Sequence, residues 1–139
     1  MYCETAANMR FDQREKEGIR ILDLRGRLKG GDSEPDLRTA ITTLVEAGVV
    51  NIILNLAEIN RIDGDELETM VFCYAQIRNR GGTLKLLHLN ADRLSLNVLT
   101  KLTTVFEVFT DERDAVNSFF PHRAVHRFDV LEWVQTSDF

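Results

Sequence analysis

The stretch VVNIILNLAEINRIDGDELETMV (residues 49–71) decides the fold. Residues 49–56 form a nearly continuous apolar run of strand length, which is typical of a strand covered on both faces of a sheet. The acidic motif that follows leads into apolar side chains at helical spacing, and a pair of glycines ends that helix. These residues are Leu67, Met70, Val71, Tyr74 and Ile77, followed by Gly81 and Gly82. A buried strand that leads into a helix predicts one unit of an α/β domain.

The rest of the chain repeats this alternation. Residues 9–14 and 19–28 alternate apolar and polar side chains around a turn, which predicts two hairpin strands. Ser33 and Pro35 mark the start of a helix that ends at Gly48. Downstream we expect a strand, a short helix, a strand and a helix, at residues 83–89, 91–102, 105–109 and 111–120. The sequence therefore predicts an α/β fold with about five strands in a mixed, mostly parallel sheet and about four helices, with the hairpin as an antiparallel edge.

Composition and charge limit the possible functions. A chain of 139 residues, 44% hydrophobic and 28% charged, is expected to form one domain. Its net charge of -5 repels a phosphate backbone and no basic patch offsets it, so nucleic acid is not an expected partner.

The first ten residues do not resemble a secretory signal, and no apolar run is long enough to cross a bilayer. With two cysteines, too few for a disulfide framework, a cytoplasmic protein without direct membrane insertion is expected.

Three carboxylates crowd around one glycine: Asp63, Asp65 and Glu66 beside Gly64. Catalytic acid–base pairs usually come from different elements and face each other across a substrate, whereas these acids lie within four consecutive residues. The sequence has no glycine-rich phosphate loop that would accompany a magnesium site. A helix cap explains the motif well, because Asp63 or Asp65 can accept hydrogen bonds from the first turn and Glu66 interacts favourably with the helix dipole. A cap needs one acid, so the surplus charge leaves a partner-binding surface as the other interpretation.

Four phrases of the sequence resemble one bacterial family and occur in its order: ILDLRGRL, NIILNLAEINRID, RNRGGTLKLL and TKLTTVFEVFTDERDAVNSF. Together they are similar to a STAS domain of the anti-sigma factor antagonist (anti-anti-sigma factor) type, over about residues 8–120. The resemblance implies a single STAS-like domain at residues 1–120 that is not an enzyme and needs no cofactor. It also implies a partner, an anti-sigma factor of the histidine-kinase-like ATPase class, which would itself bind the nucleotide.

The acidic motif falls on the family's phosphorylation motif. In that family the helix after the third strand begins with Asp-Ser-Ser/Thr-Gly and a leucine, and the anti-sigma factor kinase phosphorylates the second hydroxyl residue. Asp63 and Leu67 match the aspartate and the leucine, and Gly64 replaces the first serine. Asp65 stands at the phosphoacceptor and Glu66 replaces the glycine. Because aspartate keeps about one negative charge where phosphoserine carries about 1.5 to 2, the resemblance implies a switch fixed near its phosphorylated sense.

The partner is expected to contact the first turn of this helix, at residues 63–68. Asp65 and Glu66 would set whether binding occurs, and Glu68 belongs to the same surface. Asp63 would cap the helix, and Leu67 would seat the turn on the core. The preceding glycine-rich loop is expected to form a neighbouring rim, which consists of Gly30, Gly31, Asp32 and Ser33.

Two rival hypotheses remain open from the sequence. A scaffold or assembly subunit, either a homo-oligomer or a component of a membrane-associated complex, would keep the fold and lose the switch, and the missing hydroxyl favours it. An enzyme or small-ligand binder would use the acidic cluster, and it predicts thermal stabilisation by a divalent metal or a nucleotide.

Phe72 is predicted to point away from the core face, toward a polar side with Glu68, Thr69 and Gln76. It is therefore either a contact for something outside the core or a single exposed apolar residue of the ordinary kind. Cys73 is expected to be inert, at or near the surface of the helix.

Residues 121–139 extend beyond the resemblance. Their apolar side chains, Phe128, Leu131, Trp133 and Val134, need burial, so we expect a short amphipathic helix from about Asp129. Trp133 is thus a second candidate interaction residue, either against its own domain or across a homodimer. His122 and His126 have the spacing of helical zinc ligands, but Pro121 and the missing third ligand argue against a metal site.

Overall fold

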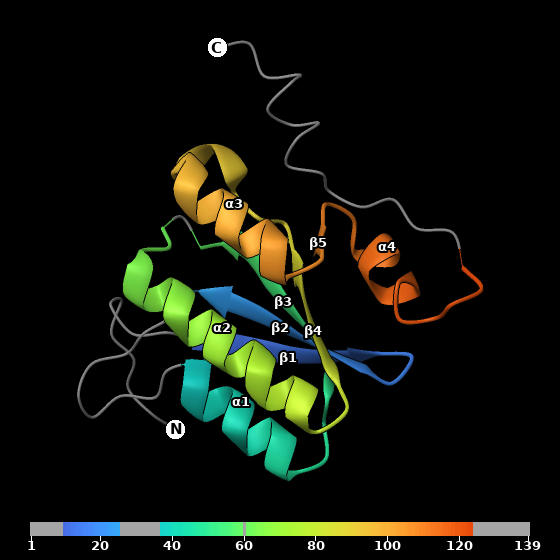
Figure 1. Cartoon of the computed structure of the whole chain (residues 1–139). Coiled ribbons are helices and arrows are strands. Elements are labelled where there is room, and N and C mark those ends of the chain that lie inside the picture. Colours follow the sequence, from blue (N-terminus) through green and yellow to red (C-terminus); the bar gives the residue numbers. More distant parts are fainter. Residues whose placement is uncertain (1–9, 26–36, 60, 124–139) are drawn as a thin grey trace.

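The computed structural model of the chain describes residues 10–25, 37–59 and 61–123. They form one five-stranded sheet with helices on both faces (Figure 1). The strands are β1 (Arg10–Lys16), β2 (Ile19–Arg25), β3 (Asn51–Glu58), β4 (Thr83–Leu87) and β5 (Val108–Phe109). The helices are α1 (Leu37–Glu46), α2 (Gly64–Asn79), the 3-10 turn η1 (Ala91–Arg93), α3 (Leu96–Val105) and α4 (Glu112–Asn117). The predicted α/β fold with about five strands and four helices is confirmed.

The sheet has the strand order β1-β2-β3-β4-β5. β1 and β2 form an antiparallel hairpin, in which Arg14 pairs with Ile21, and every following pair is parallel. The predicted antiparallel edge is therefore confirmed. In the parallel part the carboxyl ends of the strands share one edge of the sheet, and α2 begins at that edge, after β3.

The apolar run that decides the fold is buried on both sides. Ile52, Leu54 and Leu56 of β3 belong to the larger core cluster, together with side chains of α1, α2 and α3. Ile53 belongs to the smaller cluster on the other face, which α4 covers with Ala115 and Val116. Because β3 contributes to both clusters, its sequence is almost continuously apolar, whereas apolar and polar side chains alternate in β1.

Several predicted boundaries are wrong, and two of the differences have a clear structural cause. The helix expected at residues 91–102 is divided, because Ser95 interrupts it and caps α3, its side chain accepting a hydrogen bond of 3.2 Å from the backbone N–H of Val98. The strand expected at 105–109 is only Val108–Phe109, because Val105 still belongs to α3. Phe106, at the end of α3, packs edge-on against Tyr74 of α2 with ring centroids 5.2 Å apart. This part of the apolar run therefore packs one helix against another and does not form a strand.

Candidate functional site

The first turn of α2 is fixed by a reciprocal pair of hydrogen bonds. Asp63 is the N-cap, and its Oδ1 accepts a hydrogen bond of 3.0 Å from the backbone N–H of Glu66. Glu66 Oε1 accepts one of 3.1 Å from the backbone N–H of Asp63. This capping box satisfies two donors that a helix start otherwise leaves unpaired. The prediction that Asp63 caps the helix is confirmed.

Glu66 lies inside the protein, which corrects the expectation that it faces a partner. Its side chain is 0% exposed. The residue therefore acts as part of the helix cap, and it contributes no side chain to the outer surface of the turn. The signal was present in the sequence, because an acid at the cap followed three residues later by Glu is the pattern of a capping box.

The outer surface of this turn consists of Gly64, Asp65 and Glu68, which are all exposed. Leu67 is 9% exposed and belongs to the larger core, as expected for the residue that seats the turn. The structure thus brings Asp65 and Glu68 together on one face and turns Glu66 away from it. The rim residues Gly30, Gly31, Asp32 and Ser33, and likewise Trp133, lie outside the described residues.

Thr69 offers no accessible hydroxyl. It is 3% exposed, and its Oγ1 donates a hydrogen bond of 3.1 Å to the backbone carbonyl of Asp65. The expectation that Thr69 lies on an exposed polar side is therefore wrong. Because residues 61–73 contain no other Ser or Thr, this part of the chain presents no phosphoacceptor hydroxyl.

The side of α2 that carries Phe72 faces α1. Phe72 is 45% exposed, and the Arg38 guanidinium carbon lies 4.4 Å from its ring centroid, a cation–π contact. Next to it Gln76 donates a hydrogen bond of 3.0 Å to Thr42 of α1. Phe72 is thus exposed, as predicted, although part of its ring is covered within the domain.

A groove runs between α2 and α3, next to the capped turn. Its volume is about 460 Å³, and its lining includes Leu67, Glu68 and Val71 of α2 and Lys101 and Val105 of α3. Val71 is 37% exposed, so the prediction that it lies on the core face is wrong. Cys73, expected at or near the surface, is instead 0% exposed. Both errors have the same cause: four apolar residues in succession, at positions 70–73, go around the whole helix, so their sequence does not show which of them are buried.

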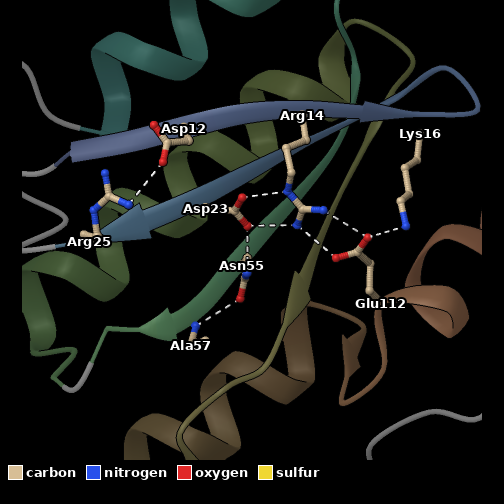
Figure 2. A network of polar contacts seen from close by, with 8 residues as sticks. All are labelled: Asp12, Arg14, Lys16, Asp23, Arg25, Asn55, Ala57 and Glu112. Carbon is tan, nitrogen blue, oxygen red and sulfur yellow. Dashed lines mark hydrogen bonds and ion pairs between the residues drawn. The ribbon is translucent and has the colours of Figure 1, made fainter.

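A polar network on the other face of the sheet was not predicted (Figure 2). Arg14 of β1 forms paired hydrogen bonds of 2.7 and 2.9 Å with Asp23 of β2, and of 3.1 and 2.9 Å with Glu112 of α4. Lys16 also contacts Glu112, at 2.8 Å, and Asn55 of β3 donates to Asp23 at 2.7 Å. The network ties α4 to the hairpin. Residues 12, 14 and 16 are all charged, and this spacing of two is the sequence signal that places them on one face of a strand.

These contacts perturb the carboxyl groups in one direction. Hydrogen bonds from Arg14, with a further one from Lys16, outweigh burial and lower the pKa of Glu112 from 4.5 to about 2. The hydrogen bond from Arg14, aided by Asn55, also lowers the pKa of Asp23. Both acids are therefore held ionised, and each is engaged by a cation of the same chain, so the network has the character of a structural clamp.

The described part of the chain holds no group of three or more His, Cys, Asp or Glu placed to bind a metal ion. Within residues 10–25, 37–59 and 61–123, no helix combines the length and the apolar character needed to cross a bilayer. His122 is exposed, and His126, the other half of the considered zinc pair, lies outside the described residues.

Comparison with known proteins places this geometry in context. The family described as "STAS domain" matches residues 10–115. The NMR structure of the protein TM1081 has a TM-score of 0.63 and 18% identity, covering 84% of this chain and 94% of the other. The crystal structure of an anti-sigma factor antagonist from Mycobacterium paratuberculosis has a TM-score of 0.62 and 14% identity, covering 84% of this chain and 97% of the other. No curated protein matches the chain. At these identities the structural matches show a common fold.

Proposed function

Because this chain belongs to the STAS domain family, we propose that it is a non-enzymatic protein-binding domain of the anti-sigma factor antagonist kind, which acts in partner-switching control of transcription. The structural similarity to an anti-sigma factor antagonist supports this choice within the family. Its partner is an anti-sigma factor of the kinase-like ATPase class, which brings its own nucleotide, so this chain requires no cofactor.

The observation that carries the proposal is the orientation of Asp65. It is exposed on the first turn of α2, while the neighbouring Glu66 is fully buried. The resemblance of the sequence to the family's motif assigns position 65 to the phosphoacceptor. The capping box holds this turn in place, so the carboxylate is presented by a rigid helix start. A permanent negative charge therefore occupies the surface where a relative's kinase would add a removable one.

The charge on this surface comes from Asp65 and Glu68. Phosphoserine carries about 1.5 to 2 negative charges, so Asp65 supplies about half of that effect, and Glu68 lies one turn further along the same exposed side. Since a kinase that binds the unphosphorylated form discriminates against added charge, this surface favours the phosphorylated sense of the switch. Residues 30–33 are proposed as the rim of the same contact.

The test restores the motif of the family. The variant with Gly64→Ser and Asp65→Ser is compared with the native chain for binding to anti-sigma factor kinases of the same organism, by calorimetry, and for phosphorylation with ATP. Gain of kinase binding and phosphate at position 65 in the variant supports the proposal. Asp92→Ser is the matched control, because Asp92 is also an exposed acid and lies outside α2, on η1.

One observation favours a second function, that of a scaffold or assembly subunit in a homo-oligomer or a membrane-associated complex. The described first turns of α2 present no hydroxyl that a kinase could use, since Thr69 is buried. For a scaffold, restoring Ser at positions 64 and 65 changes no binding, and light scattering of the native chain or its complex reports a fixed assembly.

A further inference from the structure

The groove between α2 and α3 is an apolar surface that the described residues leave open. Val71 of α2 lines one wall and is 37% exposed. The groove begins at Leu67, in the capped turn, and reaches Val105, the last residue of α3. Its volume of about 460 Å³ is large enough for several apolar side chains.

The groove continues into a second, more polar hollow. Val105 lines both, and the hollow, of about 320 Å³, is also lined by Tyr74, Arg78 and Glu107. The two form one path along the seam between α2 and α3. Basic side chains stand beside both parts of this path, Lys101 at the groove and Arg78 at the hollow.

The chain leaves the described region close to the polar end of this path. Lys85, which also lines the hollow, has its Nζ 2.8 Å from Ser118 Oγ and 2.8 Å from Glu107 Oε1, so the end of α4 and the hollow share one cation. Arg123 is held at the same end of α4, because its guanidinium donates a hydrogen bond of 2.8 Å to Asn117. From there 16 residues, 124–139, remain.

Those residues have the composition that the path requires. On a helix, Val130, Leu131, Trp133 and Val134 fall on one side, while Asp129 and Glu132 fall on the other. The five residue steps from Arg123 to Phe128 can extend about 17 Å, so Phe128 can lie that far from the end of the described chain. The two acids of this segment are opposite in charge to Arg78 and Lys101.

We propose that residues 128–134 of the same chain bind in the groove between α2 and α3, with Val130, Leu131, Trp133 and Val134 against Val71 and Val105. This contact covers the flank of the capped turn, at Leu67 and Glu68.

Trp133 provides the readout, because it is the only tryptophan of the chain. In the native protein its emission is expected to be blue-shifted and protected from acrylamide. Val71→Asp places a charge in the groove, so it should shift the emission to the red and raise the quenching constant several-fold. Phe72→Asp is the matched control: Phe72 is the neighbouring exposed apolar residue on α2, it does not line the groove, and its replacement should leave Trp133 protected.

Circular dichroism confirms that both variants are folded, and the measurements are repeated over a wide range of protein concentration. Equal, solvent-like quenching of Trp133 in all three proteins would overturn the proposal. Equal protection in all three places Trp133 elsewhere and overturns it too. Protection that appears only at high concentration assigns the groove to the segment of a second copy, and it rejects the same-chain contact. Because these experiments need no partner, they can succeed even if kinase binding is never found.

Discussion

Replacing the buried Glu66 with alanine should destabilise the protein far more than replacing the exposed Asp65 beside it. The Glu66 side chain is 0% exposed, and it accepts the hydrogen bond from the backbone N–H of Asp63. In Glu66→Ala that N–H loses this acceptor in a partly buried place, at a cost of about 1–3 kcal/mol. The space left by the side chain adds to this loss, whereas removal of a buried charge offsets part of it. We therefore expect a net loss of about 2 kcal/mol.

Asp65→Ala is the matched control. Asp65 is exposed and precedes Glu66 in the same first turn, so its loss removes a favourable interaction with the helix dipole, worth about 0.3–1 kcal/mol. Glu66→Ala also preserves half of the capping box, because the backbone N–H of residue 66 can still donate to Asp63.

The assay is urea unfolding followed by far-ultraviolet circular dichroism. A loss of about 2 kcal/mol lowers the midpoint by about 1 M urea at the slopes usual for small domains. A cycle with Asp63→Ala, Glu66→Ala and the double variant should show a coupling energy above zero between the two side chains. If Glu66→Ala were no more destabilising than Asp65→Ala, the assignment of Glu66 to the helix cap would be refuted.

Three further outcomes are expected. Since the pKa of Glu112 is lowered, its pair with Arg14 contributes stability above pH 4.5 that is lost as the pH falls from 4.5 to about 2. With solvent screening, this contribution is about 1–2 kcal/mol. The free energy of unfolding of Glu112→Gln should therefore depend less on pH in that window than that of the native chain. A Cβ on Gly82 would collide with the backbone carbonyl of Val50, so Gly82→Ala should lower the free energy of unfolding by about 1–3 kcal/mol, measured in urea. An unchanged urea midpoint would contradict the close approach of Gly82 and Val50, which directly precede β4 and β3. Cys73 is fully buried, so a thiol reagent should modify it only when the protein is unfolded, and rapid native labelling, mapped by mass spectrometry, would argue against this packing.

The alternation of strands and helices could be predicted from the sequence because each element carries a local signal. The run at residues 49–56 predicts β3, and the glycines after Asn79 predict the end of α2. Boundaries were less certain where apolar residues continue from a helix into a strand. Val105 and Phe106 fit either state, and packing against Tyr74 decides between them.

The orientation of side chains around the site depended on contacts that periodicity does not report. Asp65 and Glu66 were both expected to present a negative charge on the partner-binding surface. The capping box turns Glu66 inward, and only Asp65 is exposed. Likewise Val71 and Cys73 are both apolar residues of α2, and the place of α3 leaves Val71 beside an open groove while Cys73 lies in the core. The clamp around Arg14 joins residues up to 98 positions apart, which no local pattern could bring together.

We propose that a fixed carboxylate at position 65 governs recognition at the start of α2. The most direct measurement is the affinity of an anti-sigma factor kinase from the same organism for the native chain and for the Gly64→Ser/Asp65→Ser variant, in the presence of ATP analogue. We expect weak binding by the native chain and at least about tenfold tighter binding by the variant, a difference of about 1.4 kcal/mol. Equal affinity of the two proteins for a kinase that binds them both would contradict it.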